Sequence, residues 1–252
     1  MRAVLLAAGA ATRLRPLTDD IPKCLLPVGE STILGMTVDN LAANGVQEIV
    51  IVTGYREDQI HAFMTSHYPE QRVTFLTNER YADTNNIYSL WLTRGLLQGH
   101  SMLLLDSDIV FDPRIISLIL QSGHEDCLAV VRTKALGDEE IKVRTGATGA
   151  ILEISKEVNA STAFGESIGI EKFSPRFVSR MFDVLEDKIV SRKQHNQFYE
   201  AAFQELIDKG ERIYAVDVGN LPCVEIDTPD DLAAARKLFD SGGPPPKHPG
   251  AR

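Results

Sequence analysis

The chain lacks the residue patterns that several large classes of protein require. Its 252 residues include three cysteines, Cys24, Cys127 and Cys223, which are far apart and lack metal-ligand spacing. We therefore expect reduced structural thiols rather than a disulfide framework. No apolar run reaches the length of about 18 residues that a membrane span needs, and no charged segment followed by a hydrophobic stretch stands at the N-terminus. We expect a cytoplasmic protein without membrane contact.

Basic residues are also in deficit. The chain has 26 Lys and Arg against 35 Asp and Glu, a formal net charge of −9, which argues against nucleic acid as a partner. Its hydrophobic fraction of 44% and charged fraction of 24% are typical of a globular protein. We predict a single domain over 1–240. The tail over 241–252, rich in Gly and Pro, cannot build a core and is expected to be disordered.

The order of the apolar segments predicts the fold class. Strands and helices alternate in the first half, which indicates a mainly parallel sheet with crossover helices. The predicted strands there are 2–6, 48–53, 72–77, 102–106 and 127–132, and the helices 32–44, 57–67, 86–97 and 112–121. An insertion at about 133–173 brings short strands at 141–145, 150–155 and 166–173, and the chain ends with helices 175–188, 196–209 and 229–239 and strands 212–218 and 222–226. This order predicts an α/β, Rossmann-like three-layer sandwich with a mainly parallel mixed sheet and a small antiparallel addition.

A loop with almost no side chains follows the first strand. Such a loop lets a ligand approach backbone N–H groups, which is how many proteins bind phosphates. Arg13 and Lys23 place two cations beside it. The alternative is a surface loop with two solvated cations. The residues predicted to bind a nucleotide here are Leu6, Ala7, Ala8, Gly9, Ala10, Ala11 and Thr12.

Two acidic pairs stand at the ends of predicted strands. Asp106 and Asp108 close one strand, and the strand period of two would point both to the same side. Glu225 and Asp227 close another and face alike, and Thr228 after them is a predicted helix N-cap. Carboxylates at strand ends suit Mg²⁺, although Asp-x-Asp alone is as typical of a turn or a helix N-cap. Because ligands of open α/β sheets bind at the carboxyl ends of the strands, we expect these groups near the loop.

The combined motifs resemble a known enzyme family. Leu6-Ala7-Ala8-Gly9, Arg13 and the later Lys23 resemble the signature of nucleotidyltransferases, which couple a nucleoside triphosphate to a small phosphorylated compound. The resemblance implies a nucleotide-diphospho-sugar transferase-like fold and catalytic roles for Arg13 and Lys23. It also implies Mg²⁺ as cofactor, bound by Asp108 and Asp227.

One position departs from that signature. Ala11 stands where the family usually has a second glycine. An alanine is accommodated there only with a negative φ, so we expect the backbone at Ala11 to have one.

The segment over 81–92 narrows the resemblance. Asn85-Asn86-Ile87-Tyr88-Ser89-Leu90 resembles the corresponding stretch of phosphocholine cytidylyltransferases, which implies that Asn85, Asn86 and Ser89 contact the nucleotide and that this is CTP. Asn85 or Thr84 can equally cap the following helix. Trp91 is interpreted as core.

The acceptor side is less specific. The candidates for acceptor binding are Asp106, Lys142, Lys156, Glu166 and Glu225. The stretch 133–163 contains no aromatic residue, although a choline site would be expected to use aromatic rings. Its charged residues could equally form a solvated hairpin face, and Phe198 and Tyr199 could supply an aromatic wall or core.

The resulting hypothesis is a Mg²⁺-dependent cytidylyltransferase that couples CTP to a small phosphorylated or phosphonate acceptor and releases pyrophosphate. Phosphocholine, other amines, amino acids and polyols stay open as the acceptor. One alternative is a sugar-1-phosphate nucleotidyltransferase using UTP, dTTP or GTP, and another is a nucleotide sensor without catalysis. The family includes both monomers and larger assemblies, so the resemblance leaves a homo-oligomer open.

Overall fold

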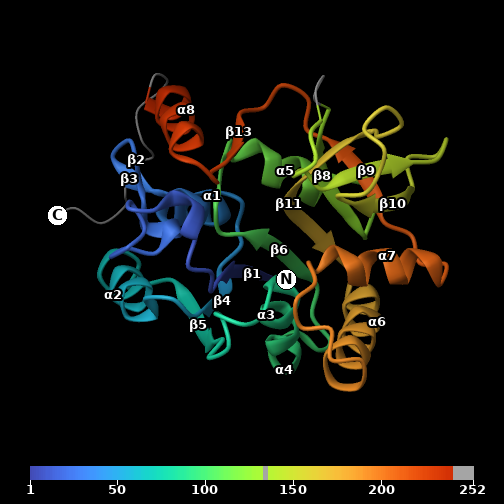
Figure 1. The fold of residues 1–252 in the computed structure, drawn as a ribbon, viewed down its shortest axis with the longest axis horizontal. Helices are drawn as coiled ribbons and strands as arrows, with labels where there is room; N and C mark the ends of the chain where they lie inside the picture. Colours follow the sequence, from blue (N-terminus) through green and yellow to red (C-terminus); the bar gives the residue numbers. More distant parts are fainter. Residues whose placement is uncertain (133–135, 241–252) are drawn as a thin grey trace.

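The computed structural model describes residues 1–132 and 136–240 (Figure 1). Its strands are β1 (Arg2–Ala7), β2 (Pro27–Val28), β3 (Ser31–Thr32), β4 (Glu48–Thr53), β5 (Arg72–Thr77), β6 (Met102–Asp106), β7 (Ile109–Phe111), β8 (Cys127–Val131), β9 (Lys142–Thr145), β10 (Ile151–Ser155), β11 (Gly165–Phe173), β12 (Tyr214–Asp217) and β13 (Cys223–Glu225). Its α-helices are α1 (Ile33–Ala43), α2 (Glu57–His67), α3 (Asn86–Leu92), α4 (Arg94–Leu97), α5 (Arg114–Gln121), α6 (Pro175–Glu186), α7 (Glu200–Asp208) and α8 (Pro229–Asp240). Short 3-10 helices η1 (Thr12–Leu14) and η2 (Lys23–Leu25) and a π-helical turn η3 (Asp187–Ser191) complete the described elements.

The central sheet is mixed, with a parallel half and an antiparallel half. Its main path runs β10-β9-β11-β6-β1-β4-β5, and β8 pairs with β11 and β12. The strands β6, β1, β4 and β5 are parallel to one another, whereas β11 runs antiparallel to β6. The register places Leu6 of β1 opposite Val52 and Asp106, so the carboxyl ends of these strands lie at one edge. The predicted fold class is confirmed.

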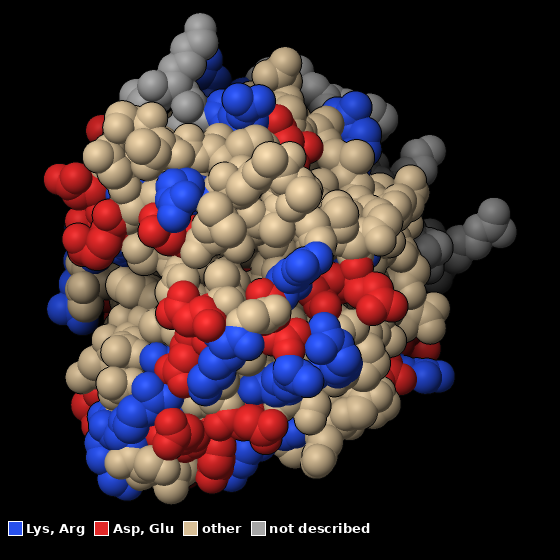
Figure 2. Space-filling model, turned by 90° about the vertical axis from the view of Figure 1, so that its right-hand side faces the viewer, with Lys and Arg blue, Asp and Glu red and all other residues tan. Residues whose placement is uncertain are grey.

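The surface of the molecule mixes the two signs of charge. Figure 2 shows Lys and Arg side chains interspersed with Asp and Glu over the side that carries α6 and α7. Ion pairs join these elements and their neighbours, among them Arg176 with Glu211 and Lys209 with Glu205. Within the described residues, none of the helices combines the length and apolar character needed to cross a membrane.

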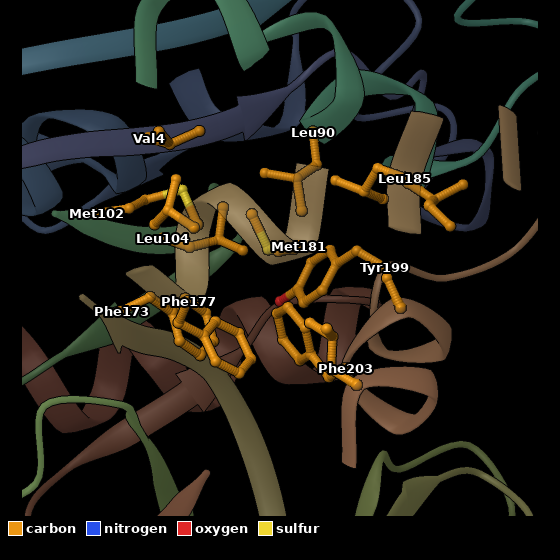
Figure 3. Packing of buried hydrophobic residues seen from close by; sticks show 14 of the residues in the cluster. Val4, Leu90, Met102, Leu104, Phe173, Phe177, Met181, Leu185, Tyr199 and Phe203 are labelled. Carbon is orange, nitrogen blue, oxygen red and sulfur yellow. The ribbon is translucent and has the colours of Figure 1, made fainter. Parts of the chain in front are cut away.

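Alternation along the parallel strands produces two cores, one on each face of the sheet. Val4 and Leu6 of β1 point to the face covered by α3, α6 and α7, and Figure 3 shows Val4 and Leu104 on the side of Met181. Ala3 and Leu5 point to the other face, which α1, α2 and α5 cover. Because both faces are buried, these strands are almost wholly apolar.

A third, smaller core ties the C-terminal helix to the start of the chain. Leu14 and Leu26 pack with Ile226 and with Leu232 of α8. Figure 1 shows α8 beside β2 and β3. This contact brings the acids that precede α8 towards the loop that follows β1.

The element boundaries differ from the sequence in a few places. The predicted helix over 86–97 is divided at Thr93, whose hydroxyl donates to the carbonyl of Leu90. The predicted helix over 196–209 starts only at Glu200, and that over 175–188 ends at Glu186 before the π-helical turn. Strands β2, β3 and β7 were missed because two or three residues are too few for a period to show. The tail predicted to be disordered lies outside the described residues.

Candidate active site

A cavity of about 680 Å³ opens at the carboxyl edge of the parallel strands. The end of β1 contributes the small-residue loop, the end of β5 contributes Asn78, and the end of β6 contributes Asp106 and Asp108. Of the predicted loop residues, Ala10 and Thr12 do not line the cavity. Those that do are Leu6, Ala7, Ala8, Gly9 and Ala11.

The loop presents backbone to the cavity. A Cβ built on Gly9 meets no described atom within 4 Å, so the space beside this residue is open. The expectation of a negative φ at Ala11 was wrong: φ is 46° and ψ is 52°. The reason is local bonding, because the carbonyl of Ala11 accepts from the backbone N–H of Leu14 at 3.1 Å and from Oγ1 of Thr18 at 2.9 Å. This conformation costs an alanine roughly 1–2 kcal/mol relative to right-handed backbone.

Two cations and two carboxylates form a compact group at the mouth of the loop. Lys23 Nζ lies 2.8 Å from Asp108 Oδ2 and 2.8 Å from Asp227 Oδ1, and the Arg13 guanidinium donates to Asp227 Oδ2 at 2.7 Å. Burial alone would lower the pKa of Lys23, but the charges of Asp108 and Asp227 outweigh it and raise that pKa. The four residues come from the first and last quarters of the chain and from the end of β6.

A third carboxylate completes a set that fits a divalent cation. Oxygens of Asp108, Glu225 and Asp227 all lie within 4.8 Å of one another. Oδ1 of Asp108 is buried and has no hydrogen-bond partner among the described residues. Burial, followed by the charges of Asp108 and Asp227, raises the pKa of Glu225 to about 8. An all-oxygen donor set of this kind suits Mg²⁺.

The pairing of Asp106 and Asp108 on one side was also wrong. Because β6 ends at Asp106, Asp108 lies in a turn, and the strand period no longer relates the two side chains. Asp108 meets Lys23, whereas Asp106 accepts a hydrogen bond from Tyr199, although both line the cavity.

The amide residues at the start of α3 have structural partners as well as a place in the cavity wall. Asn85 is the N-cap of α3, and its Oδ1 accepts from the backbone N–H of Asn86 at 2.7 Å. Asn86 Oδ1 accepts from the backbone N–H of Tyr199, which ties α3 to the segment before α7. Ser89 is buried and accepts from Asn78 Nδ2. All three predicted nucleotide contacts therefore line the cavity with part of their polar capacity already used.

The candidates for acceptor binding are divided by the structure. Lys142 does not line the cavity, because its buried ammonium donates to the carbonyls of Gly137 and Glu140. Lys156 lines the cavity and pairs with Glu139 at 3.0 Å. Glu166 also lines it, and burial raises the pKa of this carboxyl to about 7.

Sequence comparison now decides the family, because the nucleotidyl transferase profile matches residues 2–135. The chain belongs to the nucleotidyl transferase family. It is 28% identical over 255 residues to CTP:phosphoglutamine cytidylyltransferase of Campylobacter jejuni, covering 92% of this chain and 98% of that protein. It is 37% identical over 94 residues to choline-phosphate cytidylyltransferase of Streptococcus pneumoniae, 37% of this chain and 39% of that one. The fold matches a solved CTP:phosphocholine cytidylyltransferase of Streptococcus pneumoniae with a TM-score of 0.77 at 21% identity, over 94% of this chain and 98% of the other.

This nucleotidyltransferase also carries cavity groups that the sequence reasoning missed. Glu200 lines the cavity at the start of α7, and the fully buried Glu171 lies behind it on β11. Tyr199 is completely buried rather than part of an aromatic wall, whereas Phe198 lines the cavity. A signal existed for Glu171, since an acid between apolar residues of a strand needs a buried partner.

Proposed function

We propose that this nucleotidyltransferase is a cytidylyltransferase that couples CTP to a small phosphorylated or phosphonate acceptor and releases pyrophosphate. The observation that carries the proposal is the meeting of the open backbone loop, two cations and three carboxylates in one cavity. The choice of CTP is supported by the two relatives named above, both of which are cytidylyltransferases. Asn85 and Asn86 offer the amide donors and acceptors that reading a cytosine ring requires.

The proposed reaction needs little proton transfer from the protein. A phosphate monoester has its second pKa near ~6 and is mostly dianionic at neutral pH, so its oxygen can attack the α-phosphorus without a general base. A bond forms from that oxygen to the α-phosphorus, and the bond from the α-phosphorus to the bridging oxygen breaks. Pyrophosphate leaves with the electron pair. Positioning and charge neutralisation then supply most of the catalysis.

Each charged group has a role in that scheme. Arg13 would neutralise the departing phosphates from its place beside the loop. Lys23 would hold the phosphate groups of donor and acceptor where they meet, exchanging its present carboxylate partners for them. Asp108, Glu225 and Asp227 would hold Mg²⁺, which supplies further neutralisation of phosphate charge when bound.

The test is pyrophosphate release by the full chain with Mg²⁺, using CTP, UTP, dTTP and GTP in turn. The acceptor panel comprises small amine phosphates and phosphonates, phosphorylated amino acids, polyol phosphates and sugar-1-phosphates. Turnover of CTP with a small acceptor is the expected result. Turnover confined to UTP, dTTP or GTP with a sugar-1-phosphate would contradict the cytidylyl assignment. Nucleotide binding without pyrophosphate release for any acceptor would indicate a sensor.

A further inference from the structure

The cavity contains far more acid than a site for two phosphate-bearing substrates would require. Among the described residues, nine acidic side chains line it against three basic ones. The three basic side chains, Arg13, Lys23 and Lys156, already pair with Asp108, Glu139 or Asp227. A divalent cation accounts for the acids around Asp108. It does not account for those on the far side of β6.

On that far side, three carboxyl groups share a single hydroxyl proton. The Tyr199 hydroxyl lies 3.0 Å from Asp106 Oδ2 and 3.2 Å from Glu171 Oε1, and it can donate to only one of them at a time. Oε2 of Glu171 and Oε2 of Glu200 are buried and have no hydrogen-bond partner within residues 1–132 and 136–240. Glu200 is 5% exposed and lines the cavity. The group therefore lacks donors on the side that faces the cavity.

The surroundings hold these carboxyls in place. Tyr199 packs against Phe203, with ring centroids 5.2 Å apart, and Figure 3 shows it among the apolar side chains beneath the sheet. Gly169 has a φ of +66°, and a Cβ there would lie 2.5 Å from Asp106 Oδ2, so only glycine leaves room for this carboxyl. The β11 register shifts between Ser167 and Glu171, an irregularity of the kind found beside active sites.

The charge of the group is also unbalanced. Burial is the main cause that raises the pKa of Glu200, to about 7, and Lys156 offsets it only in part. Burial and then the charges of Asp106 and Glu200 raise the pKa of Glu171 well above its ordinary range. A ligand that brings positive charge and N–H donors would satisfy both deficits at once.

We propose that the acceptor of this enzyme carries a primary ammonium group, which Glu200 and the Asp106–Tyr199–Glu171 cluster bind. The proposal rests on the proposed cytidylyl transfer and names its acceptor class. A primary ammonium has three N–H donors for the orphaned carboxylate oxygens. A trimethylammonium has the same charge but no donor, and would leave those oxygens unpaired in a buried site.

The aromatic contribution to this part of the cavity points the same way. Recognition of a trimethylammonium relies on aromatic faces. Phe198 lines the cavity, but Lys156 Nζ already lies 4.8 Å from the centroid of its ring. The ring face is thus taken by a cation of the protein.

The experiment compares three matched compounds: phosphoethanolamine, phosphocholine and ethyl phosphate. Binding of each to the full chain with Mg²⁺ is measured by titration calorimetry, and pyrophosphate release is measured with CTP. We expect phosphoethanolamine to bind at least ~10-fold more tightly than the other two, which corresponds to one or two charge-assisted hydrogen bonds. Equal binding of the three, including no detectable binding of any, would overturn the proposal, as would preference for phosphocholine.

Variants connect that preference with the cluster. Glu200→Gln and Glu171→Gln should each reduce the ratio of phosphoethanolamine to ethyl phosphate binding at least ~3-fold, while Glu125→Gln, an exposed acid at the opposite end of β8, should leave it unchanged. An unaltered ratio in both cluster variants would overturn the assignment of these residues. If one variant does not fold, the other and the wild-type comparison still decide.

The two proposals fail in different ways. Preferential binding of phosphoethanolamine without pyrophosphate release from any nucleotide would refute the transfer reaction and support the ammonium site. Pyrophosphate release from CTP with ethyl phosphate or phosphocholine at equal or higher kcat/KM would support the transfer reaction and refute the ammonium site.

Discussion

Asp227 is the point where both active-site cations meet. Burial alone would raise the pKa of this carboxyl, but Lys23 and then Arg13 outweigh it and lower the pKa. Asp227 is therefore ionised wherever a phosphate monoester is dianionic. The same two cations are held in place for phosphates, since Lys23 is only 12% exposed and Arg13 reaches across the cavity mouth. A cation that leaves Asp227 for a phosphate exchanges one anion for another.

The two neighbouring arginines supply a matched test at this scale. Arg13 lines the cavity, whereas Arg15 pairs with Asp19 outside it. Arg13→Gln should lower kcat/KM by ~10²-fold through lost neutralisation of the leaving phosphates, and Arg15→Gln should change it less than about twofold. Steady-state pyrophosphate release by the two variants checks this. Equal losses in both would show that the effect is one of general surface charge.

The element that positions Asp227 is the start of α8. Asp231 Oδ2 accepts from the backbone N–H groups of Asp227 and Thr228, and Thr228 Oγ1 accepts from the N–H of Asp231. This reciprocal arrangement confirms Thr228 as the N-cap that the sequence predicted. Pro229 then begins the helix with a fixed φ. The helix start thus holds the backbone on which Asp227 stands.

The cap can be tested without touching the charges. Thr228→Ala removes the acceptor of the Asp231 N–H and should lower the free energy of unfolding by about 1 kcal/mol, whereas Thr228→Ser keeps it and should change the free energy little. Denaturant unfolding followed by circular dichroism would measure both. A stability of Thr228→Ala equal to that of the wild type would mean that the cap contributes nothing to the folded chain.

At the scale of the molecule, the intermixed surface charges in Figure 2 include networks rather than isolated pairs. Glu205 of α7 accepts from Lys209 at 2.8 Å and from Arg192 at 2.9 Å, and pairs with Lys188 at 3.2 Å. Burial would raise the pKa of Glu205, but hydrogen bonds from Arg192, Lys209 and Lys188 outweigh it and lower the pKa from 4.5 to about 2. The network joins α7 to the π-helical turn after α6.

This network predicts how stability depends on pH. Because the pKa of Glu205 falls on folding, its contribution is complete above about 4.5 and is lost as the pH falls towards about 2. Glu205→Gln should therefore cost roughly 1–2 kcal/mol of unfolding free energy at pH 7, a figure reduced for solvent screening. The difference from wild type should shrink between pH 4.5 and pH 2. Urea unfolding of both proteins across that interval tests it, and a pH-independent difference would contradict the linkage.

Local patterns carried much of the prediction. The parallel strands, the family and the caps of α3 and α8 follow from short stretches of sequence, because apolar periodicity and capping are properties of neighbouring residues. Trp91 shows the limit of such patterns. Interpreted as core, it is only partly buried, and its Nε1 donates to Glu186 on α6. Helical spacing indicates which side of a helix is apolar but not how far the partner helix covers it.

What the sequence alone determined is the order of the elements, the fold class and the identity of the loop and acidic motifs. The tertiary structure decided which of those motifs share a cavity. It turned Lys142 away, gave Ala11 a positive φ and placed Glu171 of β11 against Tyr199, 28 residues later. The physical reason is that a buried polar group must find its partner in whatever element packs beside it. Periodicity describes one segment at a time, whereas that partner is set by sheet order and helix docking between segments far apart in the chain.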